Sequence, residues 1–198
     1  MKLNLGCGLR HRDGWVNVDS EAACRPDRVV DLEALPWPFP DDSVDEVHMS
    51  HVLEHLGART AVFLGIFREL YRICRPGARI EIKVPHPRHD AFLIDPTHVR
   101  PITLQTLQMF DQAKNIEWAT GGFSNTPLGV YLGVDLRIVA YAKVLDPAWK
   151  RRHDAGEVST DELRHAMRSY NNVVEELQAT LEVVKPGRAG GARDATPR

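Results

Sequence analysis

Residues 2–8 read K-L-N-L-G-C-G, and this short stretch decides the fold. Lys2–Leu5 has the character of a short buried strand, and Gly6-Cys7-Gly8 breaks it. Glycine allows a ligand to approach the backbone where any Cβ would clash. A strand that runs directly into such a turn predicts a sheet that holds a ligand at its strand ends.

Four further segments have a strand pattern, and one helix lies between the last two. From Thr60 to Cys74, apolar residues recur at helical spacing, and Pro76-Gly77 ends the helix. Strands that alternate with helix and loop predict an α/β domain with a mostly parallel sheet. The four strand segments are Trp15–Asp19, Val29–Leu32, Val44–Ser50 and Ala78–Val84.

The carboxylate that follows the second strand is the next clue. Asp19 lies where a side chain can accept hydrogen bonds from both hydroxyls of a ribose. It follows Gly8 by only 11 residues, whereas a dinucleotide-binding fold has about 20 with a full helix between. We therefore expect the first helix to be absent or a single turn. The missing third glycine of G-x-G-x-x-G also counts against a dehydrogenase.

Taken in order, these motifs resemble those of the class I S-adenosylmethionine-dependent methyltransferases, in the branch that acts on small molecules. The resemblance covers about residues 2–145. It implies a Rossmann-like sheet of the seven-stranded type, methyltransferase activity and S-adenosylmethionine as cofactor. The motifs that carry it are N-L-G-C-G, V-N-V-D, D-L-E-A-L-P-W-P-F-P-D-D-S-V-D-E-V, S-H-V-L-E-H-L and F-R-E-L-Y-R-I-C-R-P-G-A-R-I-E-I-K-V-P.

The resemblance implies where the cofactor binds. Gly6 and Gly8 would line its methionine and ribose, Asp19 would bind the ribose diol, and Asp31 with Leu32 would face the adenine. Turn formation is the alternative role for both aspartates. The implied cofactor-binding residues are Asn4, Gly6, Cys7, Gly8, Asp19, Asp31, Leu32 and Ser50.

Two histidines are the catalytic candidates. His51 and His86 both leave strand ends that face the expected cleft, and a neutral imidazole near pH 7 can remove the proton of a hydroxyl acceptor. Ordinary hydrogen bonding is an equal alternative for both. Positioning of the acceptor against the methyl group is expected to supply much of the rate.

The same region raises the question of a metal. His51, Glu54 and His55 spell H-x-x-E-H, the inverted zincin signature, which requires both histidines on one regular helix. His51 is expected on the strand-end loop, so no metal is predicted. A second set in the following loop suits a divalent ion but is interpreted as a hydrogen-bonding substrate loop. That set is His86, His89, Asp95 and His98.

Composition limits the partners and the compartment. The chain has 198 residues, 43% of them hydrophobic, and a net charge of −2, without the basic surplus of a nucleic-acid binder. No apolar run approaches the ~18 residues of a membrane helix, and no signal peptide is visible. Three cysteines outside any CxxC arrangement indicate reduced thiols and a cytoplasmic protein. We expect a small-molecule acceptor, such as a sugar or another metabolite, methylated on oxygen or nitrogen.

The C-terminal part is expected to lie outside the methyltransferase domain, which is assigned to residues 1–149. A linker (150–158), one long helix (159–185) and a disordered tail (186–198) would follow. Val134–Leu145 is expected as the final strand, with Ile116–Ala119 as a possible antiparallel mate. Ser159 and Glu162 form a capping box. Residues at heptad spacing after it predict a coiled-coil seam for self-association or a partner helix, with packing on the domain as the alternative. They are Leu163, Met167, Tyr170, Val174, Leu177, Leu181 and Val184.

Two other functions remain open at this stage. The chain can be a catalytically silent S-adenosylmethionine-binding subunit of another protein, since binding residues do not establish chemistry. It can also be a metal-dependent hydrolase that uses the histidine cluster. The sequence does not identify the methyl acceptor.

Overall fold

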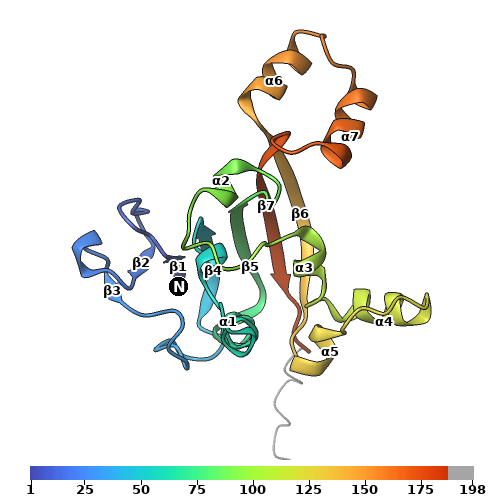
Figure 1. Cartoon of the computed structure of the whole chain (residues 1–198). Coiled ribbons are helices and arrows are strands. Elements are labelled where there is room, and N and C mark those ends of the chain that lie inside the picture. Colours follow the sequence, from blue (N-terminus) through green and yellow to red (C-terminus); the bar gives the residue numbers. More distant parts are fainter. Residues whose placement is uncertain (187–198) are drawn as a thin grey trace, which may run out of the picture.

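The computed structural model describes residues 1–186, and the strands of this part form one seven-stranded sheet (Figure 1). Its order is β3-β2-β1-β4-β5-β7-β6. The first five strands in the chain pair in parallel, and β7 pairs antiparallel with both β5 and β6. The strands are β1 (Lys2–Leu5), β2 (Val16–Asp19), β3 (Arg28–Val29), β4 (Val44–Ser50), β5 (Cys74–Pro85), β6 (Leu136–Leu145) and β7 (Val174–Val183).

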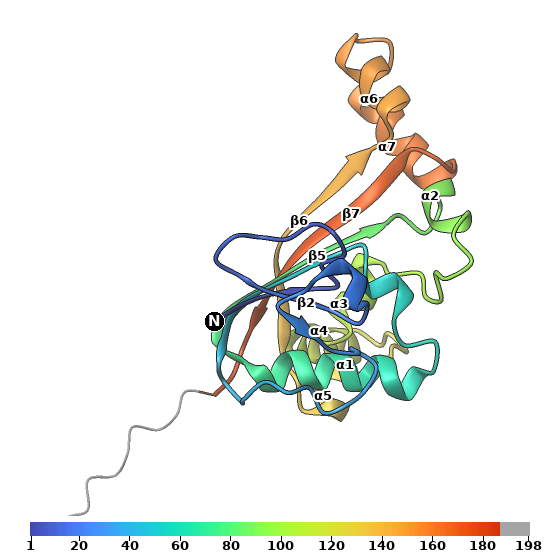
Figure 2. The ribbon, with the colours of Figure 1, turned by 90° about the vertical axis from the view of Figure 1, so that its left-hand side faces the viewer.

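Helices lie on one face of this sheet, where α1, α3, α4 and α5 gather (Figure 2). Strand β5 explains the asymmetry, because Ile80 and Ile82 are buried towards the helices while Glu81 between them is exposed. On the polar face, Arg79 pairs with Glu182 of β7 at 2.9 Å. The helices are α1 (Thr60–Ile73), α2 (Asp90–Leu93), α3 (Leu104–Gln108), α4 (Gln112–Thr120), α5 (Leu128–Leu132), α6 (Pro147–Asp154) and α7 (Thr160–Ser169).

The chain passes from β1 to β2 through a loop, residues 6–15, in place of a first helix. Buried amide side chains hold this loop: Asn4 Nδ2 donates to the Arg10 carbonyl at 3.0 Å and to Asn17 Oδ1 at 2.9 Å. Asn17 Oδ1 also accepts from Arg12 N at 2.8 Å. The predicted shortening of the first helix is confirmed, and these hydrogen bonds replace part of the order that a helix would give.

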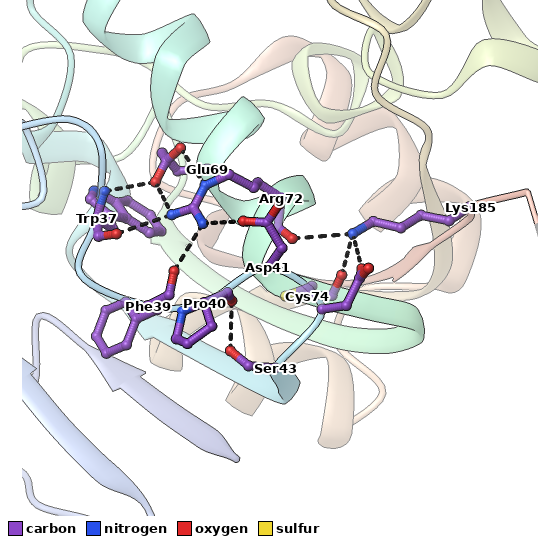
Figure 3. Close-up of polar contacts among 10 residues, drawn as sticks. Trp37, Phe39, Pro40, Asp41, Ser43, Glu69, Arg72, Cys74 and Lys185 are labelled. Carbon is purple, nitrogen blue, oxygen red and sulfur yellow. Dashed lines mark hydrogen bonds and ion pairs between the residues drawn. The ribbon is translucent and has the colours of Figure 1, made fainter. Parts of the chain in front are cut away.

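The loop of residues 31–42 is fastened to α1 by hydrogen bonds from Arg72 and Glu69 to its backbone and by the ion pair between Arg72 and Asp41 (Figure 3). Arg72 donates to the carbonyls of Phe39 and Trp37 at 2.9 and 3.0 Å, and to Glu69 Oε2 at 2.6 Å. Glu69 Oε2 also accepts from Trp37 N at 2.7 Å. These charge-assisted hydrogen bonds pair backbone N–H and C=O groups of the loop that would otherwise have no partner.

The C-terminal prediction is wrong, because residues 159–185 do not form one helix. Helix α7 ends at Ser169, Asn172 takes a left-handed conformation with φ +57°, and β7 begins at Val174. In β7, Leu177, Ala179, Leu181 and Val183 are buried in turn, a period of two that the heptad interpretation missed.

This correction moves the domain boundary as well. Strand β7 lies between β5 and β6, so the domain cannot end at residue 149, and the expected linker, 150–158, lies largely in α6. Without the long helix, the coiled-coil basis for self-association or a partner helix is lost. Ile116–Ala119 belongs to α4, so the antiparallel mate of β6 is β7 instead. The predicted disordered tail falls on residues 187–198, which lie outside the described part.

Helices α6 and α7 form a hairpin that projects beyond the sheet between the end of β6 and the start of β7 (Figure 1). The predicted capping box is confirmed, since Ser159 and Glu162 exchange hydrogen bonds at the start of α7. The hairpin has its own small core of Val158, Leu163, Ala166 and Val173. Among the helices of residues 1–186, none is long and apolar enough to cross a membrane.

Candidate active site

The glycine turn after β1 contains two glycines with different roles. Gly6 and Gly8 both have positive φ, +66° and +48°. A Cβ on Gly6 would lie 2.3 Å from Val52 Cγ2, so this glycine is required for packing. A Cβ on Gly8 would meet nothing within 4 Å, so this position is open to a ligand.

Asp19, at the end of β2, holds the turn in place. Its Oδ2 accepts from Gly8 N at 2.8 Å, and its Oδ1 accepts from Glu21 N at 2.9 Å. Each carboxylate oxygen has a second lone pair, so the side chain can still accept a ribose hydroxyl. The open backbone of Gly8 beside a half-buried carboxylate therefore fits an adenosyl ligand.

The expected adenine side is less complete. Asp31 is exposed, and its Oδ1 accepts from Glu33 N at 2.8 Å as a turn residue. Leu32 is only 5% exposed, and its carbonyl accepts from Trp37 Nε1 at 3.0 Å. Leu32 packs in the core, so its side chain does not form the apolar wall that we expected.

Four of the other predicted residues gather at a cavity of about 290 Å³ beside the glycine turn: Asn4, Gly6, Cys7 and Ser50. The Asn4 side chain already serves the loop of residues 6–15. Burial raises the pKa of the Cys7 thiol, and Asp19 adds to this effect. Gly8 and Asp19 are not among the residues that line this cavity.

A larger cleft of about 750 Å³ opens beyond the ends of β4 and β5. Four separate stretches of the chain meet there, including the start of β7. Sequence reasoning missed Glu175 and Glu176, because the segment from Val174 was interpreted as helix. The cleft is lined by His51, Glu54, His55, Pro85, Ala91, Ile94, Asp95, Pro96, His98, Val144, Glu175 and Glu176.

His51 stands at the turn that leaves β4, with φ +54°. Its Nε2 lies 2.7 Å from Glu176 Oε2, and its Nδ1 lies 3.5 Å from Glu54 Oε1. The nearby carboxylate of Glu54, and next the hydrogen bond to Glu176, raise the pKa of His51 above the ordinary value for histidine, and burial offsets part of this rise. The residue is thus held by two carboxylates at the edge of the cleft.

His86, the second catalytic candidate, does not line this cleft. Its Nδ1 accepts from Arg88 N at 3.2 Å. Burial, and next the positive charges of Arg88 and Lys143, lower the pKa of His86 to about 4. Such an imidazole is neutral at pH 7 but accepts a proton poorly, so the geometry favours His51 over His86 as the base.

The H-x-x-E-H motif does not have zincin geometry. His51 lies at the strand end in a left-handed conformation, and His55 closes a 3₁₀ turn, Leu53–His55. The two residues therefore do not share a regular helix. This agrees with the position on the strand-end loop that the sequence predicts for His51. In the following loop, His89 turns away from the cleft, with Nε2 at 3.5 Å from Asp146 Oδ2.

Comparison with known proteins assigns the family. A family model described as a methyltransferase domain matches residues 11–82. A SAM-dependent methyltransferase from Archaeoglobus fulgidus has a similar structure, with a TM-score of 0.59 and 19% identity over 91% of this chain and 85% of that chain. Residues 11–82 thus match a methyltransferase domain, and the fold of the chain is that of SAM-dependent methyltransferases. The predicted family is confirmed, and S-adenosylmethionine is the cofactor of these enzymes.

Other similar structures show how widely this fold is used. A methyltransferase from Methanosarcina mazei has a TM-score of 0.55 and 13% identity, over 93% of this chain and 92% of that one. The [4+2]-cyclase SpnF has a TM-score of 0.53 and 16% identity, over 93% and 75%. A search of curated proteins gave no match. Because one fold supports several reactions, the acceptor must be argued from the cleft of this methyltransferase.

Proposed function

We propose that this methyltransferase methylates an oxygen or nitrogen of a small, neutral or cationic molecule, such as a sugar or an amine. The observation that carries the proposal is the cleft next to His51. Its volume of about 750 Å³ lies within the range of small-molecule sites. Among its lining residues are Glu54, Asp95, Glu175 and Glu176, but no lysine or arginine. Four carboxylates disfavour a phosphorylated metabolite or a nucleic acid.

His51 is the residue that we propose as proton acceptor. His51 follows β4, and β4 pairs with β1, the strand that ends at the glycine turn. His51 therefore lies between the cofactor side of the sheet and the cleft that it lines. With Nε2 donating to Glu176, Nδ1 of the neutral His51 ring takes the proton of an acceptor hydroxyl, and Glu176 stabilises the imidazolium that forms. The cofactor, when bound, supplies a methyl group that its sulfonium already activates.

The experiment uses cofactor labelled in its methyl group. Purified full-length protein is incubated with fractionated small-molecule extracts, and label that enters an acceptor is followed and identified. Asparagine tolerates a left-handed backbone, so His51→Asn tests the side chain at little cost to the fold. We expect its turnover to fall by about 10²- to 10⁴-fold with an unchanged cofactor Kd.

The matched control is His165→Asn, at an exposed histidine of α7 outside the cleft. It should keep wild-type turnover. Cofactor binding without transfer to any fraction by the wild type would contradict the proposal and favour a catalytically silent binding subunit.

A further inference from the structure

Glu54 is a buried acid that lacks a hydrogen-bonding partner for its charge. Its side chain is 1% exposed, and neither carboxylate oxygen has a hydrogen-bond partner among the described residues. The nearest basic group is His51 Nδ1, 3.5 Å from Oε1. An ionised carboxylate in such a place is strongly destabilising unless a cation or donors compensate it.

The neighbouring arginine is directed elsewhere. Arg100 donates to the Gly57 carbonyl at 2.8 Å, and its guanidinium lies 4.4 Å from the centre of the Phe63 ring. The backbone of the same loop is attached to Glu54, since Val99 N donates to the Glu54 carbonyl at 2.9 Å. The loop is thus fixed against Glu54 without supplying a positive side chain to its carboxylate.

What the loop supplies is His98, in a defined tautomer. His98 Nδ1 lies 2.8 Å from the carbonyl oxygen of Phe92. A carbonyl can only accept, so Nδ1 carries a hydrogen, and in the neutral ring Nε2 keeps its lone pair. A hydrogen bond from the other ring nitrogen to a carbonyl is the arrangement that orients histidine ligands in metal sites.

In His55, a hydrogen bond to a threonine likewise places the hydrogen on Nδ1. Its Nδ1 lies 2.9 Å from Thr97 Oγ1, and the Thr97 hydroxyl donates its hydrogen to Asp95 Oδ1 at 2.6 Å. The hydroxyl must therefore accept from His55, so His55 Nδ1 carries a hydrogen and Nε2 keeps its lone pair. A carboxylate, a threonine and a histidine form one chain of donors and acceptors.

Glu54, His55 and His98 converge, with one ligand atom from each lying within 4.8 Å of the others. Ligands about 2.0–2.2 Å from a tetrahedral zinc ion are about 3.4 Å apart, so each separation would have to shorten by about 1.4 Å at most. The two imidazole rings already meet edge to face, with centroids 4.6 Å apart. Side chains can make such a movement without displacing the sheet.

We propose that Glu54, His55 and His98 bind one divalent transition-metal ion, of which Zn²⁺ is the best fit. Two imidazole nitrogens and a carboxylate suit Zn²⁺, whereas Mg²⁺ prefers oxygen ligands. The site opens on the cleft, whose other carboxylates attract a cation. This proposal departs from the sequence analysis, which predicted no metal. It also differs from the zincin interpretation, because His51 is not a ligand.

An ion with three protein ligands keeps an open position, and the three residues that would hold it line the cleft. It would hold an oxygen or nitrogen of the methyl acceptor. This last step rests on the proposed function, but the binding of the metal itself does not. Zn²⁺ binding and cofactor binding are therefore measured in separate titrations.

The test uses full-length protein without a histidine tag, treated with a chelator and titrated with ZnCl₂ by calorimetry. We expect one Zn²⁺ per chain, and at least a tenfold weaker affinity in Glu54→Gln and in His98→Gln. The control His153→Gln, at a half-buried histidine of α6, should bind like the wild type. Co²⁺ should give visible ligand-field bands in the wild type that both ligand variants lose.

Thermal unfolding separates a metal ligand from a merely structural residue. Without metal, Glu54→Gln should melt at or above the wild-type temperature, because it removes an uncompensated charge. Zn²⁺ should raise the melting temperature of the wild type and not that of the variant. Wild-type Zn²⁺ affinity in both ligand variants, or no binding at about 100 μM Zn²⁺, would overturn the site. Calorimetry with S-adenosylmethionine reports on the proposed function independently.

Discussion

The two halves of the strand-end edge are built in different ways. In the cofactor half, the glycine turn and Asp19 follow each other within residues 6–19, and backbone amides hold them. In the acceptor half, side chains from four distant stretches meet, for example His51 and Glu176, which are 125 positions apart. The first half is fixed by local backbone geometry, whereas the second depends on the packing of the whole sheet.

This difference teaches where function can vary within the fold. A site made of backbone groups tolerates little change, because every amide has a defined direction. A cleft made of side chains from separate segments can change its acceptor by substitution without disturbing the sheet. The cofactor half should therefore show its defects in stability and cofactor affinity, and the acceptor half in turnover and metal binding. Variants in both halves test this division, and those with the largest expected change in the free energy of unfolding or binding come first.

The largest effect is expected from Glu69, which fastens the loop of residues 31–42 to α1 (Figure 3). Glu69→Ala removes the acceptor of Trp37 N and leaves Arg72 without its main partner. The unpaired Trp37 N–H costs about 1–3 kcal/mol and the lost charge-assisted bonds to Arg72, which keeps Asp41, add about 1.5–3 kcal/mol, so we expect the free energy of unfolding to fall by about 3–5 kcal/mol. Chemical denaturation at pH 7 measures it, and Glu69→Gln should lose less because it still accepts from Trp37.

The pH dependence gives an internal check. The hydrogen bond from Arg72 is the main cause that lowers the pKa of Glu69 below its ordinary value. The stabilisation is therefore fully present above the pKa of an unfolded glutamate, about 4.3, and is lost as the pH falls through the folded pKa. An unfolding free energy of Glu69→Ala equal to that of the wild type at pH 7 would show that this ion pair does not hold the loop.

The next effect separates the two glycines, and Gly6→Ala tests the junction between the halves. The new Cβ would collide with Val52, which comes from the acceptor half, and φ is +66°. A left-handed alanine costs about 1–2 kcal/mol and overpacking adds about 1–3 kcal/mol, so we expect a loss of about 2–5 kcal/mol. Gly8→Ala, which meets no neighbour, should lose about 1 kcal/mol and mainly weaken cofactor binding.

A double variant shows whether the collision is the cause. Gly6→Ala with Val52→Ala should recover part of the stability lost by Gly6→Ala alone, because the space occupied by Val52 becomes free. Equal losses for Gly6→Ala and Gly8→Ala, measured by denaturation, would mean that packing against Val52 is unimportant.

Asp19→Ala tests the cofactor half directly. The change removes a possible acceptor for the ribose and leaves Gly8 N and Glu21 N without their partner. We expect cofactor affinity to fall by about 1.5–3 kcal/mol, the range for hydrogen bonds to a charged group. Calorimetry with S-adenosylhomocysteine measures it. Asp13→Ala, an exposed aspartate of the neighbouring loop, should bind normally; the same loss in both variants would argue against a specific role for Asp19.

The sequence predicted the cofactor half well because its signals are local. Strands β1 and β4 have the predicted limits, and the missing first helix followed from the short distance between Gly8 and Asp19. The resemblance also identified the family before any side chain was placed. These features depend on residues that are neighbours in the chain, which is the range that pattern reasoning covers.

The acceptor half was missed because the apolar residues of Val174–Val183 were interpreted as a heptad repeat of a helix, whereas they follow the two-residue repeat of a strand. Leu177 and Leu181 fit a heptad, but Ala179 and Val183 between and after them are equally buried in β7. Placing this segment in a helix removed Glu175 and Glu176 from the cleft. The turn signal of Asn171-Asn172, followed by valines with strand preference, was the local evidence for a strand. Convergence of Glu54, His55 and His98 depends on the fold of the loop and has no comparable local signal.

The smallest effect is expected from His86, on the acceptor side of β5. Burial lowers its pKa to about 4, with Arg88, Lys143 and His89 adding positive charge around it. An unfolded histidine titrates near 6.5, so between about pH 6.5 and 4 the unfolded chain binds a proton that the folded chain refuses. The contribution of His86 is fully present above pH 6.5 and falls as the solution becomes more acidic. Allowing for its partial exposure, we expect a loss of about 1–2 kcal/mol across this window.

His86→Gln carries no titratable group, so its unfolding free energy should fall less steeply than that of the wild type from pH 7.5 to 5. The control variant is His165→Gln, at an exposed histidine of α7. Its unfolding free energy should have the same pH dependence as that of the wild type. Denaturation at intervals of half a pH unit resolves the difference, and the window stays above the range where most carboxylates titrate. Identical slopes in the wild type and His86→Gln would mean that His86 accepts its proton equally in both states. In that case His86 would return as a candidate base, and the preference for His51 would rest on the cleft alone.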